Sequence, residues 1–115
     1  LVTWTRPLDK PFSGEVRLAR ADAGAAFSPP LTVHRDRAEI THRFDSLLVA
    51  PDGRVVVAWI DKRDLETAKA RGERYRGAAI YAAVSDDGGR SFRPERKVAE
   101  HSCECCRIAA AVAAD

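Results

Sequence analysis

Methionine is absent from this chain of 115 residues, and its three cysteines all lie within residues 103–106. No apolar run approaches the ~18 residues that a membrane-spanning helix requires. The 19 lysines and arginines nearly balance the 17 aspartates and glutamates, and no basic cluster carries interleaved aromatic residues. The composition therefore gives no argument for a nucleic-acid or a membrane partner.

A secretory signal peptide is also missing, since the chain opens directly on a strand-like segment, residues 2–5. The chain closes on residues 108–115, which read as the middle of an apolar segment. We therefore expect the sequence to be a piece of a longer protein. The missing leader then says nothing about the cellular compartment.

The most informative stretch is residues 85–92, Ser-Asp-Asp-Gly-Gly-Arg-Ser-Phe, which separates two strand-like runs. The carboxylate of Asp87 can accept hydrogen bonds from turn amides, Gly89 can adopt a positive φ, and Ser91 can add a second local hydrogen bond. Phe92 supplies an apolar anchor where the next strand begins. The sequence therefore predicts a tight hairpin at this point.

The pattern Ser-x-Asp-x-Gly-x-Ser-Phe, which starts at Ser85, resembles the Asp-box of sialidase (neuraminidase) and BNR-repeat β-propellers. A second, degenerate copy emerges when Phe27 is aligned with Phe92. Asp22 and Gly24 then take the positions of the box aspartate and glycine, whereas both hydroxyl positions are lost.

Strand-like segments recur along the chain in a regular order. They are residues 2–5, 15–19, 31–33, 45–50, 54–60, 78–84 and 92–98. A turn is expected at residues 51–53, and about two helical turns near residues 65–71. Trp4 and Trp59 lie 55 residues apart, and Phe27 and Phe92 lie 65 apart. A repeat of roughly 40–60 residues with four short strands is typical of propeller blades.

We therefore predict an all-β fold, a β-propeller fragment of about two four-stranded antiparallel blades with Asp-box hairpins. Residues 45–98 would form one full blade. Residues 1–33 would supply the outer strands of the blade before it, and residues 107–115 the inner strand of the next. An ordinary antiparallel sandwich is the alternative.

Strand direction separates the two kinds of loop. The box turn and the 51–53 turn share one face of the predicted blade, whereas the long loops, residues 34–44, 61–77 and 99–106, share the opposite face. The box is then a structural staple rather than a catalytic element. The candidate ligand-binding residues belong to the long-loop face and are Arg43, Asp45, Asp61, Arg63 and Arg107.

In sialidases, arginines on such loops hold the carboxylate of the ligand, because guanidinium groups match carboxylates bidentately. The resemblance implies hydrolysis or binding of acidic sugars, with Arg43 or Arg107 as one such arginine. The family's Arg-Ile-Pro element, nucleophilic Tyr and acid/base Asp have no match here, and neither Tyr75 nor Tyr81 has a diagnostic neighbour. Enzymatic activity therefore stays open. The alternatives are a non-catalytic propeller that binds glycan or protein at its funnel beside the remaining blades, and solvated or salt-bridged charges without a ligand.

A cysteine-rich loop contains His101, Cys103, Cys105 and Cys106. One hypothesis is a soft-metal site for Zn²⁺ or Cu(I), although the adjacent Cys105 and Cys106 are hard to direct at one ion. A second is a disulfide, either Cys103–Cys106 or a bond to a cysteine outside this sequence, which fits a periplasmic or secreted protein. Free thiols and a Cys–His catalytic pair are further options. No other cofactor follows from the sequence.

Overall fold

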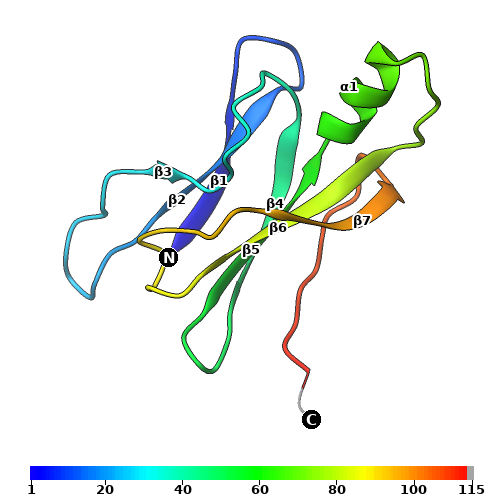
Figure 1. The fold of residues 1–115 in the computed structure, drawn as a ribbon. Coiled ribbons are helices and arrows are strands. Elements are labelled where there is room, and N and C mark those ends of the chain that lie inside the picture. Colours follow the sequence, from blue (N-terminus) through cyan, green and yellow to red (C-terminus); the bar gives the residue numbers. More distant parts are fainter. Residues whose placement is uncertain (114–115) are drawn as a thin grey trace.

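The computed structural model describes residues 1–113, which form two antiparallel β-sheets and one helix (Figure 1). The elements in chain order are β1 (Val2–Pro7), β2 (Gly14–Ala19), β3 (Leu31–Thr32), β4 (His42–Val49), β5 (Val55–Asp61), α1 (Arg63–Ala70), β6 (Ala78–Ser85) and β7 (Arg96–Ser102). The predicted all-β class is thus confirmed. These residues form neither a closed barrel nor a propeller. Within them, no helix has the length and apolar character needed to cross a bilayer.

The first three strands form a small sheet, sheet A, in the order β1-β2-β3. Strand β2 alternates from Gly14 to Leu18: Val16 and Leu18 are fully buried, whereas Glu15 and Arg17 are half-buried on the other face. Strand β1 continues beyond the predicted residues 2–5 and ends at Pro7. A proline is tolerated there because β1 is an edge strand, where a missing N–H disrupts no inner ladder.

The last four strands form sheet B, a meander in the order β4-β5-β6-β7. Strands β5 and β6 pair without interruption from Val55–Ser85 to Asp61–Ala79. Strand β4 begins at His42, before the predicted start at residue 45, and a bulge near Phe44, whose φ is 58°, lets the extra residues pair with β5. Sheet B therefore has the four-stranded antiparallel order that the sequence predicted.

The hydrophobic core lies between the two sheets. Val16 and Leu18 of β2 meet Val55, Val57 and Trp59 of β5, and all five side chains are at most 1% exposed. Complete burial of such a side chain contributes about 1.5–3 kcal/mol. Strands β1 and β2 also contact β4, so the two sheets lie side by side along that strand (Figure 1).

Helix α1 confirms the helical turns predicted near residues 65–71, although it starts earlier, at Arg63. The N-cap residue, Lys62, makes no side-chain capping hydrogen bond, but the backbone N–H of Arg63 donates to the side chain of Asp61 at 2.9 Å, which satisfies one of the free N–H groups of the first turn. Asp64 in the first turn and Lys69 in the last both complement the helix dipole. Gly72, with φ of 69°, lets the chain leave the helix.

The last strand and the tail differ from the prediction. Residues 92–95 form no strand, because the N–H of Arg93 bonds to Val84 but Pro94 has no N–H to donate. Pairing resumes at Arg96 and runs to Ser102, so β7 replaces both the predicted strand 92–98 and the start of the predicted loop 99–106. Residues 107–113 form no strand, since no neighbouring strand is there to pair with, and residues 114–115 lie outside the described residues.

The two ends of sheet B carry different kinds of connection. The turn after β4 and the box turn after β6 lie at one end. The segment before β4, helix α1 and the loop after β7 lie at the other (Figure 1). The separation expected from strand direction is therefore present.

Candidate functional site

The turn between β6 and β7 is organised by the carboxylate of Asp87. Its Oδ1 accepts hydrogen bonds from the N–H groups of Arg90 (3.0 Å) and Ser91 (2.9 Å) and from the Ser85 hydroxyl (2.7 Å). Its Oδ2 accepts from the Ser91 hydroxyl, and the buried Ser85 Oγ accepts from the N–H of Gly89 at 2.9 Å. These hydrogen bonds, that of the Ser91 hydroxyl foremost, hold the pKa of Asp87 well below its usual range.

The box turn is also packed against sheet A. Gly89 adopts a φ of +90°, and a Cβ at this position would lie 3.1 Å from Leu1 Cδ2 and 3.2 Å from Leu18 Cδ2. Phe92 packs against the buried core. Glycine is therefore required here for two reasons, the left-handed backbone and the close approach of the other sheet. The turn fastens sheet B to sheet A.

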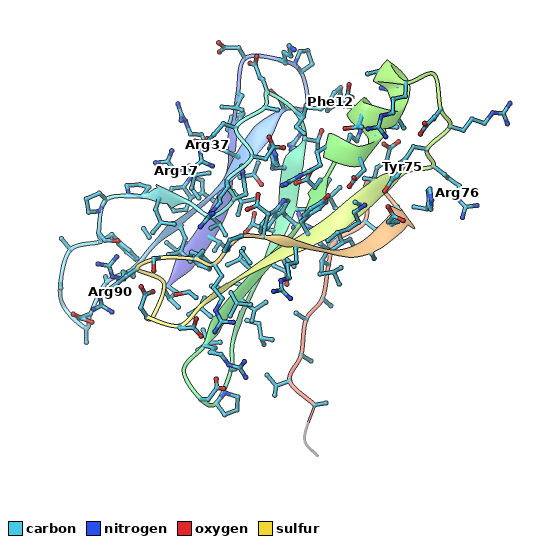
Figure 2. The ribbon with its side chains drawn as sticks, viewed as in Figure 1. Phe12, Arg17, Arg37, Tyr75, Arg76 and Arg90 are labelled. Carbon is cyan, nitrogen blue, oxygen red and sulfur yellow. A yellow bond between two sulfur atoms is a disulfide. The ribbon has the colours of Figure 1, made fainter. Side chains whose placement is uncertain are left out.

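The degenerate copy keeps the turn and loses the carboxylate network. Gly24 adopts a φ of 77°, like its counterpart Gly89, but Asp22 contributes its backbone carbonyl, which accepts from the Ala25 N–H at 2.9 Å. Phe27 is 62% exposed, in contrast to Phe92. Arg90 of the main box and residues 20–28 line a shared cleft, so the two turns are neighbours (Figure 2).

The opposite end of sheet B carries a buried network of charged side chains centred on Asp61. This fully buried carboxylate accepts hydrogen bonds from the indole N–H of Trp59 at 2.9 Å and the backbone N–H of Arg63 at 2.9 Å. It also accepts from Arg63 Nε at 3.0 Å and Nη2 at 2.7 Å. Each oxygen thus has two donors, which offsets the cost of burying the charge.

Glu95 and Asp36 extend this network to the loops. Glu95, whose side chain is 4% exposed, accepts hydrogen bonds from the N–H groups of Arg35 (3.0 and 2.9 Å) and Asp36 (3.2 Å) and from Arg63 Nη2 (3.0 Å). Burial raises the pKa of Glu95, but these donors outweigh it and lower the pKa to about 2. Asp36 Oδ2 lies 3.5 Å from Arg63 Nε, so one guanidinium serves three carboxylates.

Two stacked imidazoles complete the network. The rings of His34 and His42 lie 4.0 Å apart and 14° from parallel. His34 accepts the N–H of Val16 at Nε2 (3.0 Å) and donates from Nδ1 to the Asp36 carbonyl (2.7 Å), which defines a neutral ring. Burial, followed by the neighbouring His42, lowers the pKa of His34 to about 4. Both nitrogens of His42 lie within hydrogen-bond distance of oxygens: Nδ1 is 2.8 Å from the Gly14 carbonyl, and Nε2 is 3.1 Å from Asp36 Oδ2.

An open cleft of about 680 Å³ lies over this network, at the long-loop end of sheet B. Its lining residues are Arg35, Asp36, Ala38, Ile40, Arg63, Asp64, Glu66, Thr67 and Glu95. Four of these carry carboxylates and two carry guanidinium groups, and two of the carboxylates pair with lysines: Asp64 with Lys97 at 3.2 Å and Glu66 with Lys69 at 3.5 Å. The cleft therefore offers carboxylate oxygens as hydrogen-bond acceptors alongside apolar surface.

Tyr81 lies at the edge of this network, where its hydroxyl donates to Asp64 Oδ2 at 2.7 Å. The guanidinium of Arg63 lies over the Tyr81 ring, 4.0 Å from its centre. Burial and then the hydrogen bond to Asp64 raise the pKa of Tyr81. The phenol is therefore held in its neutral form.

The structure brings together only some of the predicted ligand-binding residues. Asp61 and Arg63 form the bidentate pair described above. Asp45 lies on β4 and accepts from the Thr5 hydroxyl at 3.2 Å, whereas the guanidinium of Arg43 lies 5.8 Å from the centre of the Phe44 ring. Arg107 is exposed in the segment after β7. Arg43, Asp45 and Arg107 therefore do not join the buried network.

The cysteine-rich loop follows β7 on the surface. Cys103 and Cys106 form a disulfide, and the exposed Cys105 is free, with its Sγ 3.4 Å from Cys103 Sγ. His101 lies apart from the sulfurs: its ring packs 4.6 Å from the ring of Tyr75, and its Nδ1 accepts from the Arg76 N–H at 3.4 Å. Tyr75 and Arg76 belong to the connection between α1 and β6 (Figure 2).

Two groups of side chains have the spacing of metal ligands, with donor atoms within 4.8 Å of one another. One is the three cysteines. The other is Asp36, His42 and Asp61, but the Arg63 guanidinium already lies against both carboxylates. A second cation at that position would be repelled, so the acidic group does not fit a metal ion.

Sequence reasoning missed most of the network. His34, Asp36 and His42 fall in the predicted charged loop 34–44, and Glu95 in a predicted strand. The sequence contains one indication of the network. In the alternation Trp59-x-Asp61, a tryptophan and a carboxylate lie two residues apart and therefore on the same face of β5.

No known family model, curated protein or solved structure matches this chain. Arguments about function therefore rest on the box turn, the buried network and the cleft.

Proposed function

We propose that this chain is part of an Asp-box β-propeller of the sialidase superfamily, with sheet B as one blade and sheet A as the outer strands of the preceding blade. The observation that carries the proposal is the hydrogen-bond network of Asp87 in the last turn of a four-stranded meander. The repeat supports it: Trp4 pairs with Arg17 in sheet A, and Trp59 pairs with Tyr81 in sheet B. Each tryptophan thus lies on a strand that pairs with the strand leading into one of the two box turns.

The second face of sheet B also supports a propeller. Small apolar side chains on this face are only half-buried, and Val98 is 65% exposed. They include Val56, Ala58, Ala82 and Val84. In a propeller the next blade covers such a face, because blades stack face to face around the central channel.

Within this fold we infer that the long-loop end binds a ligand without hydrolysing it. Arg63 is fully engaged by the carboxylates of Asp61, Glu95 and Asp36, so it has no free fork for the carboxylate of a sugar. Tyr81 donates its hydroxyl hydrogen to Asp64, and its pKa is raised by burial. A tyrosine nucleophile requires the opposite shift.

The hydrogen-bond acceptors of the cleft favour a ligand with hydroxyl groups. Its four carboxylates are each paired with an arginine or a lysine, and their oxygens can still accept hydrogen bonds from sugar hydroxyls. The proposed ligand is therefore a neutral glycan. Hydrolysis of sialosides is the second candidate, favoured by the likeness of residues 85–92 to the Asp-box.

Calorimetric titration of the 115-residue chain with neutral oligosaccharides tests the proposal. The variants Thr67→Ala and Glu66→Gln alter exposed residues of the cleft and should weaken binding about tenfold, or ~1.4 kcal/mol. Asp52→Asn, at the other end of sheet B, is the matched control and should bind as the parent does. If the chain instead releases sialic acid from a fluorogenic sialoside, and Tyr81→Phe abolishes this release, the function is hydrolysis and the binding proposal is wrong.

The disulfide bears on location. Disulfides persist in oxidising compartments, and Cys103–Cys106 is exposed to the surroundings. We therefore propose that the parent protein lies in the periplasm or outside the cell. Failure of the disulfide to form in protein exported to the periplasm, as read by intact mass with and without reductant, would refute this placement.

A further inference from the structure

The cysteine-rich loop, residues 103–106, concentrates three sulfurs on the surface. All three cysteines are exposed, and their sulfur atoms lie within 4.8 Å of one another. Cys105 Sγ is 3.4 Å from Cys103 Sγ, although Cys103 is bonded to Cys106 and not to Cys105. The glycan-binding proposal makes no use of these groups.

We propose that the reduced loop is a binding site for Cu(I), which the Cys103–Cys106 disulfide closes. Three thiolates around one ion, with metal–sulfur bonds of about 2.3 Å, lie about 4 Å apart in a trigonal plane. In the oxidised loop the three sulfurs, those of the adjacent Cys105 and Cys106 included, already lie within 4.8 Å of one another. Reduction lets Cys103 and Cys106 separate to the distance that the ion requires.

The donor set distinguishes Cu(I) from zinc. Neither His101 nor Glu104 belongs to the group of donor atoms that lie within 4.8 Å of one another: the His101 ring packs on Tyr75, and Glu104 forms an ion pair with Lys62 at 2.9 Å. Structural zinc takes four ligands, whereas three soft thiolates satisfy Cu(I). His101, which the sequence offered as a ligand, is therefore left out of the site.

The switch between the two states is a two-electron reaction. One thiolate of a dithiol reductant attacks a sulfur of the Cys103–Cys106 bond and releases the other cysteine as a thiolate. The second thiolate of the reductant then attacks the first reductant sulfur in the mixed disulfide and releases the remaining cysteine. The loop gains two thiols, the reductant becomes a disulfide, and electrons and hydrogens balance. Cu(I) then displaces the protons of the three thiols, Cys105 included.

The loop lies at the same end of sheet B as the cleft. The ion pair between Glu104 and Lys62 ties it to the residue between β5 and α1. Oxidation removes two of the three ligands at once, so the disulfide form retains one thiol, that of Cys105. Copper binding therefore depends on the redox state of the surroundings.

Competition with the Cu(I)–bicinchoninate complex tests the proposal. The chain is reduced with dithiothreitol under nitrogen, desalted, and titrated into the coloured complex. We expect the reduced chain to withdraw one Cu(I) ion per molecule and the oxidised chain to bind about 100-fold more weakly or not at all. If the reduced and oxidised chains withdraw equal amounts of Cu(I), the proposal that the disulfide closes the site is wrong.

Two variants separate the three-sulfur site from other arrangements. Cys105→Ser keeps the disulfide couple, as a two-hydrogen mass gain on reduction would confirm, yet should weaken Cu(I) binding about 100-fold. His101→Ala should leave the affinity unchanged. Copper binding that survives Cys105→Ser, or that is lost in His101→Ala, would overturn the assignment of ligands. Preference for Zn²⁺ over Cu(I) in the reduced chain would do the same.

Discussion

Replacing Asp61 with asparagine perturbs the buried network at one atom. The asparagine keeps the shape of the side chain, but its NH₂ group donates hydrogen bonds and cannot accept them. Whichever oxygen the NH₂ group replaces, the two N–H donors that face it then have no acceptor. These donors belong to Arg63 alone or to Trp59 and Arg63. The guanidinium of Arg63 also loses its nearest charge partner and keeps Glu95 and Asp36.

The magnitude follows from burial. Breaking a buried ion pair on one side costs about 3–5 kcal/mol. Arg63 is 25% exposed and retains two other carboxylates, so we expect a smaller loss, about 2–4 kcal/mol in the free energy of unfolding. For a chain of this size the corresponding fall in melting temperature is about 8–16 °C.

Urea unfolding followed by circular dichroism measures this loss. The matched control is Asp86→Asn, which removes a bidentate pair with Arg93 (2.6 and 2.8 Å) whose side chains are 48% and 62% exposed. An exposed pair contributes less than about 1 kcal/mol. Equal destabilisation by Asp61→Asn and Asp86→Asn would refute the argument that burial makes the network stabilising.

Three further substitutions test other parts of the fold. The pKa of His34 is lowered from 6.5 to about 4, so only the unfolded chain gains this proton as pH falls across that window, and stability decreases there. His34→Gln should make the stability less dependent on pH between pH 6.5 and about 4, as measured by the urea midpoint of unfolding. Gly89→Ala should lower the free energy of unfolding by about 1–3 kcal/mol more than Gly53→Ala does. Both glycines have a positive φ, but only at Gly89 would a Cβ meet neighbouring atoms, so equal losses would contradict this reasoning. Asp87→Ala should accelerate trypsin cleavage after Arg90, and an unchanged rate would show that the carboxylate does not hold the turn.

The elements that sequence reasoning located correctly are those with local causes. The alternation of Val16 and Leu18 and the apolar run of β5 mark strands by their own period. The box turn was found because Ser85, Asp87 and Ser91 act within a few residues of one another. Such signals need no knowledge of the rest of the fold.

The buried network escaped because its contacts are distant in sequence. Glu95 meets the Arg35 backbone across 60 residues, and His34 meets Val16 across 18. Charged residues in a loop read as solvated unless a buried partner is known, and here each partner lies on another element. The shifted start of β7 has a cause that is visible in the sequence, because Pro94 has no N–H to donate to the neighbouring strand.

The strand order of sheet B has a consequence for how the chain folds. Every strand pair in that sheet joins neighbours in the sequence, and the box hydrogen bonds span only residues 85–91. Closing such short loops costs little chain entropy, whereas joining Glu95 to Arg35 closes a long one. The meander should therefore form in the folding transition state before the charged network does. High φ-values for Asp87 variants and low ones for Glu95 variants in stopped-flow refolding would establish this order, and the reverse pattern would exclude it.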